Sequence, residues 1–215
     1  PEIALLKALT ERIERAAFYE GYEKNYQACM TERSDGFAAF PKLLNFSKVA
    51  QRKARDNARF EAIERFAWAI WWDNSDVAHR SLAIQELESP ESFSLTHELN
   101  REVSIKTIHI VEPIIDKDTG IFVCVVFAEL DNGGFISGGA AGPKHSRPEV
   151  FFRALSELLR HAIAVNRMKN RKITPDSFYE KRLFYFGTGQ GDNLVRKRLS
   201  ESGTKPILLP DLQFD

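Results

Sequence analysis

A helical motif near the start of the chain recurs 50 residues further on, and this internal repeat constrains the fold more than any other feature. A third segment fits the same frame in part, with Glu157 in register but Arg160 and His161 in place of Glu and Arg. We therefore expect a helical unit that occurs at least twice. The first two copies share six residues: Ala8 and Ala58, Glu11 and Glu61, Ile13 and Ile63, Glu14 and Glu64, Arg15 and Arg65, and Ala17 and Ala67.

The Glu-x-x-Glu-Arg motif places three charged side chains on one helix face, because residues three and four apart are neighbours on a helix surface. A single copy is typical of an exposed ion pair worth about 0.3–0.5 kcal/mol. The second copy runs into the apolar segment 66–72, which must be buried. Carboxylates on a largely buried helix require a positive partner. The polar stripe of this helix consists of Lys53, Asn57, Glu61 and Glu64.

Two such helices facing each other would gather more negative charge than two arginines could neutralise in a dry cleft. Mg²⁺ prefers hard oxygen ligands of this kind. Arg15 and Arg65 would then bind phosphate as bidentate donors. An alternative is an interaction module whose motifs form ion pairs across a homodimer interface. The expected metal ligands are the carboxylates of Glu11, Glu14, Glu61 and Glu64.

The rest of the chain predicts an α/β, more closely an α+β, fold with long helices and a β-meander. Hairpin signals at 118–120 and 131–134 separate the β-rich runs. Ser146 and Pro148 favour a helix start, and the residues after 168 are expected to be irregular or partly helical. We expect helices over 3–22, 47–73 and 148–168, strands over 103–113, 121–130 and 134–137, and a loop or exposed short helix over 86–100.

Charge and cysteine content narrow the function classes. Thirty basic residues balance thirty acidic ones, so the net charge supports no bulk binding to nucleic acid or to an anionic membrane. The longest apolar runs, such as Ile121–Leu130, are too short to span a bilayer. Cys29 and Cys124 have no metal-ligand spacing, and a reducing cytoplasm is the simpler expectation.

Five segments follow one another in a recognisable order: ALTERIERAAF, SDGFAA, ARFEAIERFAWAIWW, a β-rich stretch, and ISGGAAG followed by EVFFRALSEL. This order resembles the core of the YcaO domain family. That family has an Ala-Leu-x-Glu-x-x-Glu-Arg helix, a Ser-Asn-Gly-x-Ala-Ala loop, a second Glu-x-x-Glu-Arg helix, and a Gly-rich turn before an Arg-Ala-Leu-x-Glu helix. The resemblance covers about Leu5 to Arg167 and rests on the order of the motifs.

The resemblance implies a YcaO-like fold with helices packed on a mostly antiparallel sheet and an ATP and Mg²⁺ cleft between the Glu-bearing helices. It implies phosphorylation of a peptide amide oxygen, after which a thiol, a hydroxyl or sulfide attacks the amide carbon to give an azoline, thioamide or amidine. A peptide or protein substrate, with a partner protein that delivers it, is expected. The implied nucleotide-binding residues are Glu11, Arg15, Ser34, Lys53, Asn57, Glu61, Arg65, Arg153 and Glu157, and the implied metal ligands are those named above.

The chain departs from the family pattern at several positions. Lys7 replaces a Ser, Lys53 replaces an Asn, Asn57 replaces a Gln, and Asp35 replaces the Asn of the loop. A lysine in the stripe would neutralise a carboxylate or bind phosphate. A non-catalytic nucleotide-binding or scaffold protein of the same fold is therefore the alternative function. We expect a single domain over 1–215 that lacks an N-terminal segment of the family.

Other segments carry weaker signals. The Gly-rich segment 187–192 lacks the Lys-Ser/Thr of a P-loop and a clear following helix, which favours a surface turn over a phosphate loop. The turn expected at 138–142, ahead of a helix, is a better anion site, although a plain connection is favoured. His145 lies near it. The cluster Trp68, Trp71 and Trp72 is at helical spacing and indicates core packing.

Overall fold

The computed structural model describes residues 48–87, 89–114 and 120–208. The chain divides into two compact units between Arg65 and Phe66, within helix α3 (Lys48–Asp73). In the first unit the described part is the segment 48–65 of α3, which confirms the helix expected there. The helix expected over 3–22 lies outside the described residues.

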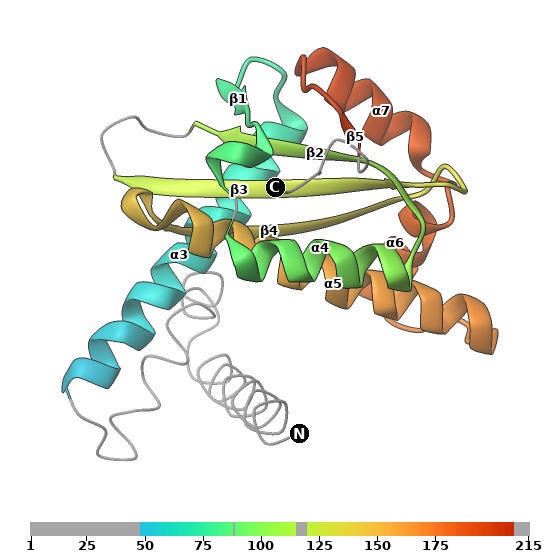
Figure 1. Ribbon diagram of the computed structural model, residues 1–215, viewed down its shortest axis with the longest axis horizontal. Coiled ribbons are helices and arrows are strands. Elements are labelled where there is room, and N and C mark those ends of the chain that lie inside the picture. Colours follow the sequence, from blue (N-terminus) through green and yellow to red (C-terminus); the bar gives the residue numbers. More distant parts are fainter. Residues whose placement is uncertain (1–47, 88, 115–119, 209–215) are drawn as a thin grey trace. The chain divides into compact units, whose positions relative to one another are not determined.

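The second unit is built on an antiparallel sheet whose central strands form a meander (Figure 1). Neighbouring strands pair in the order β2-β3-β4, as the hairpin signals predict. On the other side of β2, β1 pairs with residues 111–113 and β5 with 107–108, so these two short strands share one edge. The strands are β1 (His79–Ser81), β2 (Ile105–Pro113), β3 (Ile121–Leu130), β4 (Phe135–Pro143) and β5 (Ile207–Leu208).

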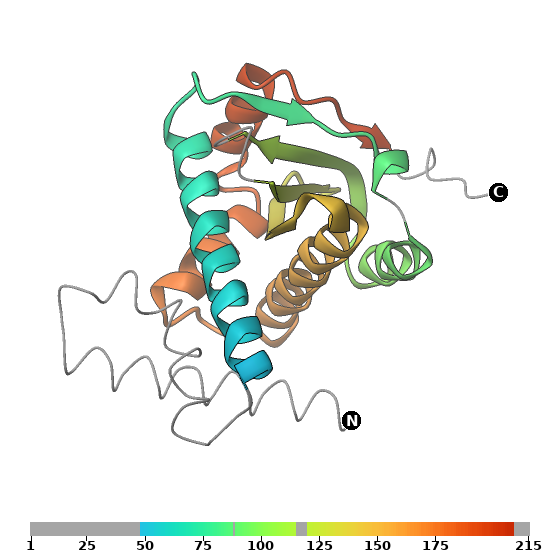
Figure 2. The ribbon, with the colours of Figure 1, turned by 90° about the vertical axis from the view of Figure 1, so that its left-hand side faces the viewer.

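Helices cover both faces of this sheet. The last turns of α3 and the helix α4 lie on opposite faces (Figure 2). Helix α5 packs against β3, β4 and α4, and α6 packs against α5. This mixture of helices and an antiparallel sheet confirms the α+β class. The remaining elements are η2 (Ile84–Glu86), α4 (Pro90–Glu102), η3 (Lys144–Ser146), α5 (Arg147–Arg171), α6 (Phe178–Gly187) and α7 (Asp192–Glu201).

Strand β3 is buried along almost its whole length because both of its faces are covered. Side chains of a strand alternate between the two faces. Phe122, Cys124 and Val126 join the core cluster that includes the buried side of α5. On the opposite face the ring of Phe127 lies 6.1 Å from that of Trp68 and 5.7 Å from that of Trp71. The prediction that the tryptophans belong to the core is confirmed for Trp71, which is fully buried.

Several segments are more helical than the sequence predicts. The polar stretch expected as a loop or exposed short helix contains α4, which is capped by Ser89 accepting the Ser92 N–H at 3.2 Å. Helix α4 is not simply exposed, because Leu99 and Thr96 are buried. The C-terminal region forms α6 and α7. Ser146 precedes α5, but its side chain makes no cap hydrogen bond.

The prediction of a turn at 138–142 is wrong, because these residues form the second half of β4. Gly138 is needed there for close packing between α5 and the strand. A Cβ on Gly138 would lie 2.3 Å from the Ala154 carbonyl oxygen and 2.6 Å from the Leu158 nitrogen. A Gly-Gly pair occurs both in turns and in strands that a helix approaches closely, so the local sequence does not distinguish these two structures.

Candidate functional site

The second Glu-x-x-Glu-Arg motif lies on α3 in the first unit, and its Glu61 and Arg65 form an i,i+4 ion pair. The Arg65 guanidinium donates to Glu61 Oε1 from Nη2 at 2.5 Å and from Nε at 3.0 Å. The Arg65 side chain is 55% exposed and that of Glu61 is 32% exposed. Glu64 is half-buried on the same helix. Arg65 is thus already paired with Glu61, and its guanidinium would have to bind a phosphate in addition to this carboxylate.

The other members of the predicted site are only partly described. Lys53 and Asn57 belong to α3, at the spacing that the stripe requires. Glu11, Glu14, Arg15 and Ser34 lie outside the described residues. The expected meeting of four carboxylates therefore stays a prediction. Within the described ranges, no group of three or more His, Cys, Asp and Glu side chains is placed to hold a metal ion.

The third motif has a definite arrangement, in which one face of α5 contacts the backbone of β4. The Gly139 N–H donates to Glu157 Oε2 at 2.7 Å. Arg153 Nη2 donates to the Ala141 carbonyl. His161 Nδ1 lies 2.5 Å from the Ser137 carbonyl oxygen. We call Arg153, Glu157 and His161 the edge-binding residues.

These contacts repeat because the helix and strand spacings match. Successive edge-binding residues are four apart on α5, which is about 6 Å along a helix. Their partners are two apart on β4, which is about 6.6 Å along a strand. The helix runs antiparallel to the strand, so each side chain reaches the next outward-facing backbone group. Among the described strands, β4 has β3 as its single neighbour, and unpaired edge groups favour unwanted strand addition. The edge-binding residues close this edge.

The edge-binding residues also keep unused polar capacity. Arg153 Nε is buried without a hydrogen-bond partner. Glu157 Oε1 lies 3.8 Å from His161 Nε2, which also contacts the Tyr179 hydroxyl. Sequence reasoning assigned no functional role to His161, although its spacing of four residues from Glu157 and eight from Arg153 was a usable signal. The nucleotide role expected for Arg153 and Glu157 stays a prediction.

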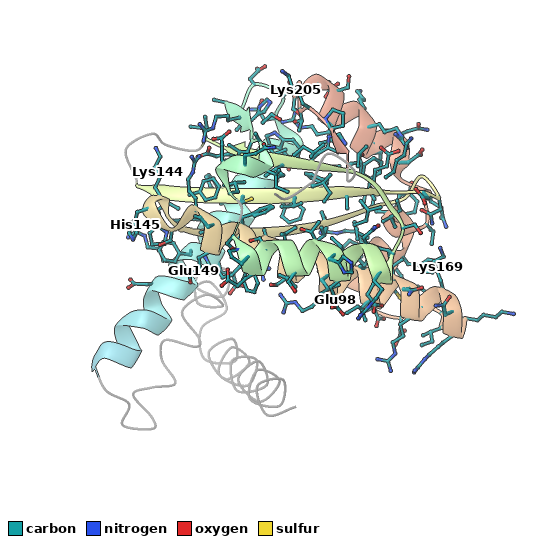
Figure 3. All side chains as sticks on the ribbon, in the orientation of Figure 1. Glu98, Lys144, His145, Glu149, Lys169 and Lys205 are labelled. Atoms are coloured by element: carbon teal, nitrogen blue, oxygen red, sulfur yellow. The ribbon has the colours of Figure 1, made fainter. Side chains whose placement is uncertain are left out.

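A second polar cluster joins the start of α5 to β1 and β2. The buried carboxylate of Glu112 accepts from Arg147 Nη2 at 2.8 Å and from Arg80 Nε at 3.0 Å. The Arg147 guanidinium carbon also lies 4.6 Å from the centre of the Phe122 ring. Paired charges of this kind satisfy a buried carboxylate. His145 lies exposed in η3, beside this cluster in sequence (Figure 3).

A third cluster surrounds Glu129 on the face of the sheet that Trp71 covers. Its carboxylate accepts from Arg196 at 2.9 Å, Thr107 at 3.2 Å and Lys106 at 3.3 Å. Burial alone would raise the pKa of Glu129, but the hydrogen bonds from Arg196 and Lys106 outweigh it, and the pKa is lowered. Burial lowers the pKa of nearby His109, and Arg196 acts in the same direction while Glu129 opposes it. This cluster attaches α7 to the sheet.

The Gly-rich segment 187–192 is a turn between α6 and α7. Two of its N–H groups bond back to the end of α6, because Gly189 donates to the Phe186 carbonyl at 3.1 Å and Gln190 to the Tyr185 carbonyl at 3.1 Å. Those donors are not directed at an anion, which favours the surface-turn interpretation. The expectation that no clear helix follows was wrong, since α7 begins at Asp192.

Comparisons with protein families, with curated proteins and with solved structures found no match. None of the helices in the described ranges combines the length and apolar character needed to cross a membrane.

Proposed function

We propose that this chain is a YcaO-type protein that uses ATP and Mg²⁺ to activate a peptide backbone amide by phosphorylation, leading to an azoline, thioamide or amidine. The observation that carries the proposal is the repeated Glu-x-x-Glu-Arg helix in the family order. The fold proposed with it is the YcaO-like one, with the nucleotide cleft between the Glu-bearing helices. The α+β class of the described residues agrees with that fold and is not specific to it.

The donor chemistry of the described residues fits Mg-ATP. Glu61 and Glu64 supply hard carboxylate oxygens on one partly buried helix face, as Mg²⁺ prefers. The buried Nε of Arg153, which has no partner, suits a phosphate oxygen. Bound ATP would supply the phosphoryl group that converts the amide oxygen into a leaving group. The role of the chain is to hold the anionic phosphates against arginine and metal, and to orient the amide beside them.

Thermal unfolding with and without Mg-ATP tests this proposal. A ligand at 100 times its dissociation constant stabilises a protein by about 2.7 kcal/mol. At roughly 2–4 °C per kcal/mol for a chain of this size, the melting temperature should rise by about 5–11 °C. Glu64→Gln and Glu14→Gln should each abolish the rise.

The matched control is Glu201→Gln. This carboxylate forms an i,i+4 pair with Lys197 on α7, as Glu61 does with Arg65, but it belongs to no motif. The control should keep the full response to Mg-ATP. If both motif variants bind Mg-ATP as tightly as the wild type, the proposed site is wrong.

A non-catalytic nucleotide-binding or scaffold protein of the same fold is the second candidate. The contacts of Arg153 and Glu157 with β4 favour it, because they give these residues a structural task. The two candidates differ in turnover. Sustained phosphate release from ATP that depends on a peptide containing Cys, Ser or Thr would rule out the scaffold.

The third candidate is an interaction module with ion pairs across a homodimer interface. The exposure of Arg65 favours it, because a side chain that is 55% exposed can reach a carboxylate of a second copy as well as Glu61. It predicts no thermal shift with Mg-ATP, and a dimer that Arg65→Glu dissociates in sedimentation experiments.

A further inference from the structure

Positive charge is concentrated on the C-terminal half of α5 and the first turns of α6. Between Arg160 and Arg182 the chain has seven Lys and Arg residues and two acidic ones, a net charge of +5, whereas the whole chain is neutral. Figure 3 shows Lys169 near the end of α5, remote from Lys144 and His145 at its start. All seven basic residues are exposed: Arg160, Arg167, Lys169, Arg171, Lys172, Lys181 and Arg182.

Most of these cations lack a partner in the part of the chain that the structure describes. The basic run of α7 is different, because Arg196 pairs with Glu129, Lys197 with Glu201, and Arg198 donates to the Trp71 carbonyl. The nearby Glu180 does not neutralise the surface either, since its carboxylate accepts the N–H groups of Asp176 and Ser177 in a helix cap. The cations without an ion pair among the described residues are Arg167, Lys169, Arg171, Lys172, Lys181 and Arg182.

Large apolar side chains are exposed among these charges. Phe178 is 82% exposed and Tyr179 is 52% exposed, in the first turn of α6. The Tyr179 hydroxyl contacts His161, which places that turn beside the part of α5 that carries Ile163. Ile163 and Ile173 are each 44% exposed. Exposed apolar groups gathered in one region mark an interaction site more often than single ones do.

We propose that this α5–α6 surface, formed by the seven basic residues with Ile163, Ile173, Phe178 and Tyr179, binds an acidic peptide segment of another protein. Carboxylates of the segment pair with the six cations that have no ion pair among the described residues, and its apolar side chains pack on Phe178 and Ile163. The positive charge of this surface is complementary to an acidic segment, and it is confined to one region of a neutral chain. A balanced net charge gives no long-range attraction to a polyanion such as nucleic acid or an anionic membrane. The inference does not depend on nucleotide binding.

The test measures fluorescence anisotropy of a labelled short peptide of Glu, Asp, Leu and Phe, titrated with the full chain at low salt without ATP. The same peptide with Lys in place of its acidic residues should not bind. The double variant Arg167→Glu/Arg171→Glu should weaken binding of the acidic peptide by at least about tenfold, because it replaces attraction with repulsion. Phe178→Ser should weaken it further without changing the charge.

The matched control is Lys205→Glu, which reverses an exposed charge near α7, away from Lys169 (Figure 3). Its affinity should stay within about twofold of the wild type. Melting temperatures verify folding, and Arg167→Gln/Arg171→Gln replaces the double variant if the latter is unstable. Three results would overturn the inference: no binding of the acidic peptide, equal losses in the control and the double variant, or tighter binding of a thymidine oligonucleotide or of phosphatidylserine vesicles than of the peptide.

Discussion

Replacing Gly138 by alanine should destabilise the second unit strongly. The new Cβ would lie 2.3 Å from the Ala154 carbonyl oxygen, whereas ordinary contact begins at 3.4 Å. Both opposing atoms, including the Leu158 nitrogen at 2.6 Å, belong to the helix backbone and cannot rotate away. Helix α5 must therefore move from β4 by roughly 1 Å, and a gap of that size loses about a quarter to a half of the dispersion energy of each contact.

We expect a loss at the upper end of the range for overpacked cores, about 3 kcal/mol of unfolding free energy. The melting temperature should fall by roughly 6–12 °C. Urea unfolding followed by tryptophan fluorescence and circular dichroism measures the loss directly.

Gly142→Ala is the internal control, because its Cβ would meet only side-chain atoms, Val150 Cγ2 at 2.7 Å and Arg153 Nη2 at 2.9 Å. These can shift, so a loss of about 1 kcal/mol is expected. The close approach of α5 to β4 is refuted if Gly138→Ala costs less than about 0.5 kcal/mol, or no more than Gly142→Ala.

Two further predictions concern the polar groups of the second unit. Glu157→Ala leaves the buried Gly139 N–H without its acceptor and should lower the unfolding free energy measured in urea by about 1–3 kcal/mol. The control Glu98→Ala, in the exposed α4 ion pair, should lower it by at most about 0.5 kcal/mol. Equal losses would refute the edge contact. The lowered pKa of His109 means that the unfolded state takes up a proton below about pH 6.5 while the folded state does not, so unfolding free energy should fall as the pH drops through that value. His109→Gln should flatten this fall between pH 7.5 and 5, and an unchanged slope would count against the assignment. Below about pH 4.5 the lowered pKa of Glu129 acts in the same direction and should persist in that variant.

The unused polar atoms of the edge-binding residues connect these stability predictions with the proposed function. Arg153 contributes to closing β4 and still has a buried Nε without a partner. Substitution of Arg153 would therefore affect both folding and any phosphate contact. The Glu64 and Glu14 variants are cleaner probes of nucleotide binding, because neither residue is among the β4 contacts described above.

Local sequence signals determined the central strands and the long helices of the described region. The apolar run at 121–130 is a strand with those bounds, and the Asp-Asn-Gly-Gly segment is the turn that follows it. The apolar end of α3 had to be buried, and Trp71 is. These signals suffice because hairpins and amphipathic helices are specified by neighbouring residues. The Glu-x-x-Glu-Arg repeat was equally visible in the sequence, and the facing of its two copies remains a prediction.

Only the tertiary structure decided the roles of Gly138, Glu157 and Arg198. From sequence alone a glycine pair predicts a turn. In the structure the backbone of α5 lies 2.3 Å from where a Cβ of Gly138 would be, so no side chain fits there. Glu157 became an acceptor for the edge of β4 because the rise of four helical residues nearly equals that of two strand residues. Arg198 belongs to a run of three basic residues, and it is buried over the Trp71 ring at 4.4 Å. Such contacts depend on residues far apart in the chain, and local pattern carries no information about them.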